Sequence, residues 1–172
     1  MKKIIVFAII AFAFLSARSQ GLYMPRDIKA AYKNETRSMD GKPGKNYWQN
    51  RGIYNISITA TPPDRTIRGK ETITYFNNSP DTLRNPVIKL FLNIHKPGAP
   101  RNGGVSADYL NSGVHIDAVT ADGKKVNWPN NPFAFTAQQF RLPASLPPHG
   151  SVQLTFDWHY EISLESNREG MI

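Results

Sequence analysis

The stretch "SVQLTFDWHYEI", residues 151–162, decides the fold predicted for this chain. Large apolar side chains occupy every second position, and polar residues lie between them. Successive side chains of a strand point to opposite faces, so this pattern predicts a β-strand with one buried and one solvated face. We expect Trp158 to be buried and His159 to be exposed. The apolar residues are Val152, Leu154, Phe156, Trp158, Tyr160 and Ile162. Their size predicts a strand inside a sheet rather than at its edge.

Three earlier stretches also favour strands. Residues 52–60 alternate with period two, and the apolar positions of one face are Tyr54, Ile56, Ile58 and Ala60. Residues 66–76, "TIRGKETITYF", predict a second strand, in which Gly69 is a candidate β-bulge. Residues 87–94 are apolar on both faces, which predicts a central strand that is covered twice.

Turn residues separate these stretches. Asp122-Gly123 lies between two β-prone runs and predicts a hairpin, because a type I′ turn needs positive φ at both central residues. "QQFRL", residues 138–142, predicts a short strand between Pro- and Gly-rich turns. No stretch has a convincing helical period. The expected fold is therefore all-β, an antiparallel β-sandwich of about seven or more strands.

The N-terminus has the pattern of a secretory signal peptide over residues 1–19. A dibasic start precedes twelve apolar residues, Ile4–Leu15, which span about 18 Å as a helix and are too short for a membrane anchor. Cleavage is expected before Gln20, with cleavage after Ala17 as the alternative. The mature chain is then extracytoplasmic, either periplasmic or secreted, with no transmembrane segment.

Residues 20–51 are basic, polar and aperiodic. We expect an extended N-terminal arm, held to the domain surface by Tyr47 and Trp48. Residues 52–172 then form the β-sandwich domain.

Composition excludes several classes of protein. The formal net charge is +8, but three of the positive charges lie in the leader and the others are scattered, which argues against a nucleic-acid partner. The chain has no cysteine. A disulfide scaffold, a thiol nucleophile and a cysteine-ligated zinc site are therefore excluded.

Few residues are candidates for chemistry. Asp157, His159 and Glu161 share one face of the last strand and could ligate zinc, although a solvated polar face is the favoured interpretation. His95, His115 and His149 each lack a carboxylate at a diagnostic spacing. The sequence contains no H-E-x-x-H, G-x-S-x-G, P-loop or Rossmann glycine pattern.

Aromatic residues gather in the loop "NWPNNPFAF", residues 127–135. Trp128, Phe133 and Phe135 could offer flat faces to a sugar. The favoured alternative is that they cover one end of the sandwich core.

Several blocks together resemble the N-terminal domain of aminopeptidase-N-like zinc metallopeptidases (the gluzincin aminopeptidases), especially the secreted bacterial forms. The blocks are "YWQNRGIYNISITATPPDRTIRGKETITYFNNSPDTL", "VIKLFLNIHKPG", "VHIDAV" and "RLPASLPPHGSVQLTFDWHYEISLESNREGM". The resemblance runs from about Tyr47 to Ile172. It is a whole-domain pattern and contains no catalytic motif.

The resemblance implies a non-catalytic sandwich that packs on a zinc-bearing catalytic domain of the same polypeptide, whose peptide substrates lose their N-terminal residues. The catalytic motifs of that family do not occur in these 172 residues. We therefore assign no catalytic, metal-binding or substrate-binding residue to this chain, and expect zinc only in the full-length parent. The domain over residues 52–172 is expected to be incomplete at its C-terminus. The alternative is a free-standing extracytoplasmic β-sandwich that binds glycan or protein.

Overall fold

The computed structural model describes residues 22–129, 131 and 134–165. The expected signal peptide, residues 1–19, lies outside them. The chain divides into two compact units, Met1–Tyr47 and Trp48–Ile172. Among the described residues, no helix is long and apolar enough to cross a membrane.

The first unit contains a short helix, α2 (Arg26–Lys33), where the sequence had suggested an extended arm. The segment "RDIKAAYK" holds good helix formers, and its charges suit the helix dipole, with Asp27 in the first turn and Lys33 in the last. Eight residues are too few for a helical period to stand out in the sequence. A turn follows, in which Ser38 donates a hydrogen bond to Asp40, and this bond is the main cause that lowers the pKa of that exposed carboxyl.

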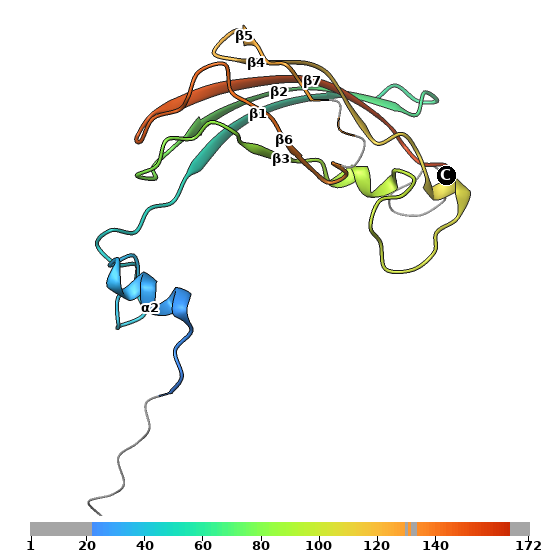
Figure 1. The fold of residues 1–172 in the computed structure, drawn as a ribbon. Helices are drawn as coiled ribbons and strands as arrows, with labels where there is room; N and C mark the ends of the chain where they lie inside the picture. Colours follow the sequence, from blue (N-terminus) through green and yellow to red (C-terminus); the bar gives the residue numbers. More distant parts are fainter. Residues whose placement is uncertain (1–21, 130, 132–133, 166–172) are drawn as a thin grey trace, which may run out of the picture. The chain divides into compact units, whose positions relative to one another are not determined.

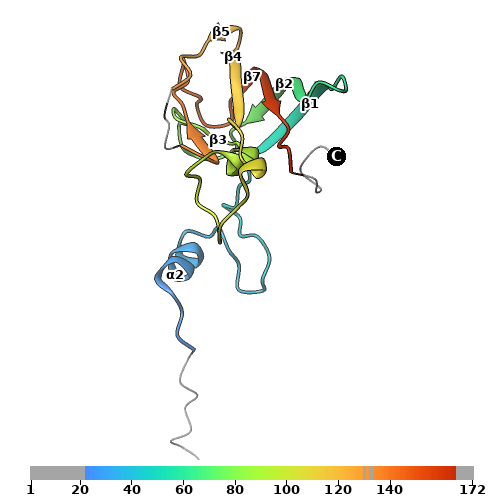
Figure 2. The ribbon, with the colours of Figure 1, turned by 90° about the vertical axis from the view of Figure 1, so that its right-hand side faces the viewer.

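The second unit is a β-sandwich built from one large and one small sheet. Five strands form the large antiparallel sheet in the order β1-β2-β7-β4-β5, and β3 pairs with β6 in the small one. Figures 1 and 2 show the large sheet curving over the β3–β6 ribbon. The bounds are β1 Arg51–Thr59, β2 Thr66–Phe76, β3 Val87–Lys89, β4 Val114–Ala121, β5 Lys124–Lys125, β6 Ala137–Gln139 and β7 Ser151–Glu161.

Strand β7 is an interior strand, as its aromatic residues predicted. It pairs with β2 on one side and with β4 on the other, both antiparallel. Its apolar side chains face the β3–β6 ribbon and form the centre of the core, where Phe156 is 2% exposed. The other buried core residues are Ile73, Val119, Ala121, Val126, Phe140, Leu142, Leu146, Val152 and Leu154.

The predicted hairpin at Asp122-Gly123 is confirmed. Both residues have positive φ, 49° and 74°, and they join β4 to β5. Asp122 also fixes the turn to β7, because its backbone N–H donates to the Gln153 carbonyl and its carboxylate accepts from the Gln153 N–H.

The prediction of a central strand over residues 87–94 is wrong. Strand β3 ends at Lys89, and a 3-10 helix, η1, spans Phe91–His95. Asn93 fixes this geometry from a buried position, since its side chain donates to the Phe135 carbonyl and accepts from the Val114 N–H. An apolar pattern on both faces does not distinguish a strand from a short buried helix.

Gly69 does not mark a bulge. The β1–β2 and β2–β7 registers both run through it without a shift. A Cβ on Gly69 would lie 2.2 Å from the Trp158 ring, so the glycine makes room for the indole. The irregularity lies in β4 instead, between Ile116 and Ala118, where Asp117 is the extra residue.

The expected burial of Trp158 and exposure of His159 are also not what the structure shows, because both side chains are half-buried. Trp158 packs against the edge of the buried core and lines an open groove, which leaves part of its ring accessible. His159 is shielded by Asp117 and His115 on the opposite face of the sheet.

Candidate functional site

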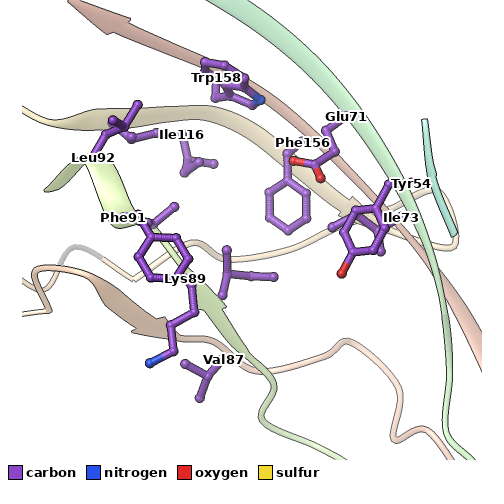
Figure 3. Close-up of a pocket in the computed structure, with 13 residues that line it drawn as sticks. Tyr54, Glu71, Ile73, Val87, Lys89, Phe91, Leu92, Ile116, Phe156 and Trp158 are labelled. Atoms are coloured by element: carbon purple, nitrogen blue, oxygen red, sulfur yellow. The ribbon is translucent and has the colours of Figure 1, made fainter. Parts of the chain in front are cut away.

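An open apolar groove lies on the inner side of the large sheet. It has a volume of about 470 Å³ and lies between the inner face of the large sheet and the segment from β3 to η1. Figure 3 shows its walls, with Trp158, Phe156 and Tyr54 on one side and Phe91, Leu92 and Val87 on the other. A second hollow of about 310 Å³ shares Tyr54, Ile73, Val87 and Ile88 with it.

Strand β1 supplies one rim of the groove and is exposed along its whole length. It is an edge strand, paired with β2 alone among the described strands. The face that the sequence predicted as apolar is therefore present but uncovered, with Tyr54 61%, Ile56 51% and Ile58 60% exposed. Contiguous exposed apolar residues of this kind mark binding surfaces in soluble proteins.

A single carboxylate projects into this apolar surface. Glu71 lies on β2 between Ile56 of β1 and Phe156 of β7, and Figure 3 shows its oxygens turned toward the groove. Burial raises the pKa of Glu71, and no other cause accompanies it. Among the described residues, no hydrogen-bond donor or cation contacts this carboxylate.

Sequence reasoning missed Glu71, although the sequence holds a signal for it. The residues of β2 that face inward are Ile67, Gly69, Glu71, Ile73 and Tyr75. Glu71 is the one charged residue in this series. A charged residue in the apolar file of a strand marks a functional or paired position, because an isolated charge in an apolar environment is costly.

The polar face of β7 is held by pairs of side chains. Asp157 pairs with Lys70 at 3.5 Å, and Glu161 pairs with Arg65. His159 Nδ1 lies 2.9 Å from Asp117 Oδ2. Within the ranges that the structure describes, no group of three or more His, Asp or Glu side chains is arranged to hold a metal ion.

The three remaining histidines lie at three different places in the fold. His95 is fully buried, stacks on Tyr109 at a ring-centroid distance of 4.2 Å and approaches the Tyr109 carbonyl. His115 is exposed and stacks on His159 at 4.7 Å. His149 lies in a turn and has a positive φ of 58°.

The loop aromatics are split. Trp128 is half-buried and packs on the core residues Phe140 and Phe156, with ring centroids 5.4 and 6.0 Å away. Phe135 is also half-buried. Phe133 lies outside the described residues.

Comparisons with known proteins give a likeness of fold. No family model and no curated protein matches the chain. The chain is similar to the M1 zinc metallopeptidase from Deinococcus radiodurans at 17% identity and a TM-score of 0.43, over 64% of this chain and 20% of that one. A mutant M1 zinc metallopeptidase from Deinococcus radiodurans gives 16% identity and a TM-score of 0.45, over 74% of this chain and 24% of that one. A mutant two-domain M1 zinc metallopeptidase bound to L-tryptophan gives the same four values.

These solved structures are M1 zinc metallopeptidases, and the likeness to them is partial. The chain spans about a fifth to a quarter of the length of these solved structures. At these identities the likeness concerns the fold alone.

Proposed function

We propose that this chain is the non-catalytic N-terminal β-sandwich of a secreted zinc-dependent, aminopeptidase-like metallopeptidase. Its open groove packs against the catalytic part of the same polypeptide and forms one wall of the active-site cleft. The parent enzyme removes N-terminal residues from peptides, and its zinc is held outside these 172 residues. The sequence blocks quoted above support the choice of family.

The observation that carries the proposal is the uncovered apolar face of β1 and β2. Tyr54, Ile56 and Ile58 are each more than half exposed, although they extend the same face that buries Ile73 and Leu154 farther along the sheet. Burying an apolar side chain of this size contributes about 1.5–3 kcal/mol, so covering the face is strongly favoured. A partner with an apolar surface meets that need.

The chemistry of the described residues agrees with a supporting role. Activation of water by zinc needs three protein ligands and an open coordination position, and a general base must take up the proton. The H-E-x-x-H sequence that supplies two of those ligands and the base is missing from the sequence. A wall of the cleft acts instead by excluding water and limiting which peptides enter.

The reading frame after residue 172 tests the proposal. We expect an in-frame H-E-x-x-H within a few hundred codons, and zinc-dependent hydrolysis of aminoacyl anilides by the polypeptide expressed from the whole frame. A stop codon directly after Ile172, with intact regulatory sequence, contradicts the proposal. Saturable glycan binding by this chain that is lost in Trp128→Ala favours the free-standing binding module.

A matched pair of variants tests the docking surface in that longer polypeptide. Ile56→Asp places a charge on the open apolar face, and Ser57→Asp places the same charge on the opposite face of the same exposed strand. We expect Ile56→Asp to lower kcat/KM and to expose the junction between the two parts to proteases. Equal effects of the two variants exclude the inner face as the contact surface.

A further inference from the structure

We propose that the groove receives an arginine side chain from the segment that packs on it, with the guanidinium paired to Glu71 and the aliphatic stem lying along the apolar walls. This deepens the proposed function, since it names the chemistry of the segment that fills the groove.

Charge complementarity is the first argument. Glu71 is partly buried on the inner face of the sheet, between Ile56 and Phe156, and none of the described residues neutralises it. An ionised carboxylate in an apolar surface is costly unless it is paired. A cation supplied from outside the described residues removes that cost.

The cations already close to Glu71 do not serve this purpose. Lys70 is the next residue of β2, so its side chain lies on the opposite face, where it pairs with Asp157 at 3.5 Å. Lys89 lines the groove, but Figure 3 shows its amino group on the far side, turned away from Glu71. The carboxylate is therefore left for an incoming group.

The walls of the groove favour arginine over lysine. Tyr54, Phe91 and Trp158 bring three aromatic rings to one groove. A guanidinium is planar, weakly hydrated and stacks on aromatic faces, whereas an ammonium is compact and strongly hydrated. The guanidinium also binds a carboxylate through two parallel hydrogen bonds.

The dimensions agree with a side chain carried by a polypeptide. A volume of about 470 Å³ lies in the range of pockets that enclose most of a small ligand. The second hollow lies beside the groove, since Tyr54, Ile73, Val87 and Ile88 line both, and it offers an extended segment room for its flanking residues. Arginine and aromatic residues are enriched at the centres of protein interfaces, where such anchors carry most of the binding free energy.

The test uses this chain and three tripeptide amides as probes: acetyl-Leu-Arg-Phe-amide, the same peptide with citrulline in place of arginine, and the same peptide with lysine. Citrulline has nearly the shape of arginine and no charge. Binding is followed by nuclear magnetic resonance titration of the amide groups of β2 and β7. We expect the arginine peptide to bind about tenfold more tightly than the citrulline peptide, and more tightly than the lysine peptide.

Two variants assign the effect to the groove. Glu71→Gln is expected to abolish the discrimination between arginine and citrulline. Asp157→Asn changes the net charge equally on the other face of the sheet and is expected to retain the discrimination. Phe91→Ala truncates a side chain that is 74% exposed. It is expected to weaken the binding of all three peptides and to leave the protein folded.

Three results overturn the inference: equal binding of arginine and citrulline, discrimination that survives Glu71→Gln, or tighter binding of the lysine peptide. Thermal unfolding of each variant verifies that it is folded. The outcome is separate from that of the proposed function, because the downstream reading frame can contain or lack H-E-x-x-H whatever the peptides do.

Discussion

Gly69 and Trp158 show how one residue without a side chain shapes the sheet. They are cross-strand partners, and the indole occupies the space above the glycine. Glycine in a strand weakens it unless another group comes close, and here the ring does so. The sequence marks Gly69 as special, but only the register between β2 and β7 tells what the glycine accommodates.

Gly69→Ala is expected to destabilise the chain by about 1–3 kcal/mol, because the new methyl group overlaps the Trp158 ring. Urea unfolding monitored by tryptophan fluorescence measures the change. Gly104→Ala is the control, since a Cβ there meets no atom within 4 Å, and it is expected to change stability by less than about 0.5 kcal/mol. Similar losses in both variants are incompatible with this packing.

Glu71 gives a prediction for the pH dependence of stability. Burial raises its pKa above the ordinary value of 4.5 in the folded chain, so the folded state binds this proton more tightly than the unfolded state does. Stability from this group is therefore present at low pH and is lost as pH rises through the folded pKa.

Glu71→Gln should therefore raise the melting temperature at neutral pH. The gain should shrink as the pH falls through the raised folded pKa toward 4.5, and it should be lost below 4.5, where wild-type Glu71 is protonated in both states. Thermal unfolding of both proteins across the acidic range measures this. Asp157→Asn controls for the change in net charge. A gain that is constant with pH shows that the carboxylate is not desolvated.

At the scale of elements, the bounds of the long strands were predictable from the sequence. Strand β2 has the expected bounds, β7 ends at Glu161 where residue 162 was expected, and β7 is an interior strand as foreseen. The segment from Val87 to His95 was not predictable, because apolar residues on both sides carry no single period. Its geometry depends on Asn93, whose partners Phe135 and Val114 are distant in sequence.

Contacts between residues distant in sequence also explain why the candidate site could not be predicted. Alternation predicted the apolar face of β1 correctly, but burial depends on what lies opposite, and the β3–β6 ribbon covers only part of the sheet. Likewise, the polar face of β7 gave no sign of Asp117, because a bulge brings that residue to His159 and bulges leave little trace in sequence.

Strand β7 allows a direct comparison of its two faces. Phe156→Ala removes the most buried apolar side chain and is expected to cost about 3–5 kcal/mol. His159→Ala removes a half-exposed side chain whose partner Asp117 is also exposed, and is expected to cost less than about 1 kcal/mol. Chemical denaturation of the two variants measures both. Equal costs contradict the register that places them on opposite faces.

At the scale of the molecule, the described residues leave the sandwich unevenly covered. The small sheet protects the middle of the large one, while β1 presents apolar side chains on both of its faces, since Ile53 is 56% exposed as well. An exposed, apolar edge strand also offers unpaired backbone groups to another chain. Both features promote association when nothing covers them.

This chain on its own is therefore expected to self-associate with rising concentration, through the open face of β1. Size-exclusion chromatography with light scattering measures the mass at several concentrations. Ile58→Lys places a charge on the inner face of the edge strand and is expected to shift the population toward monomer, because a lysine at an edge opposes pairing. Thr59→Lys adds the same charge on the outer face and is expected to shift the population toward monomer by a smaller amount. A stable monomer at all concentrations shows that the open face needs no partner, and so removes the observation on which the proposed docking surface rests.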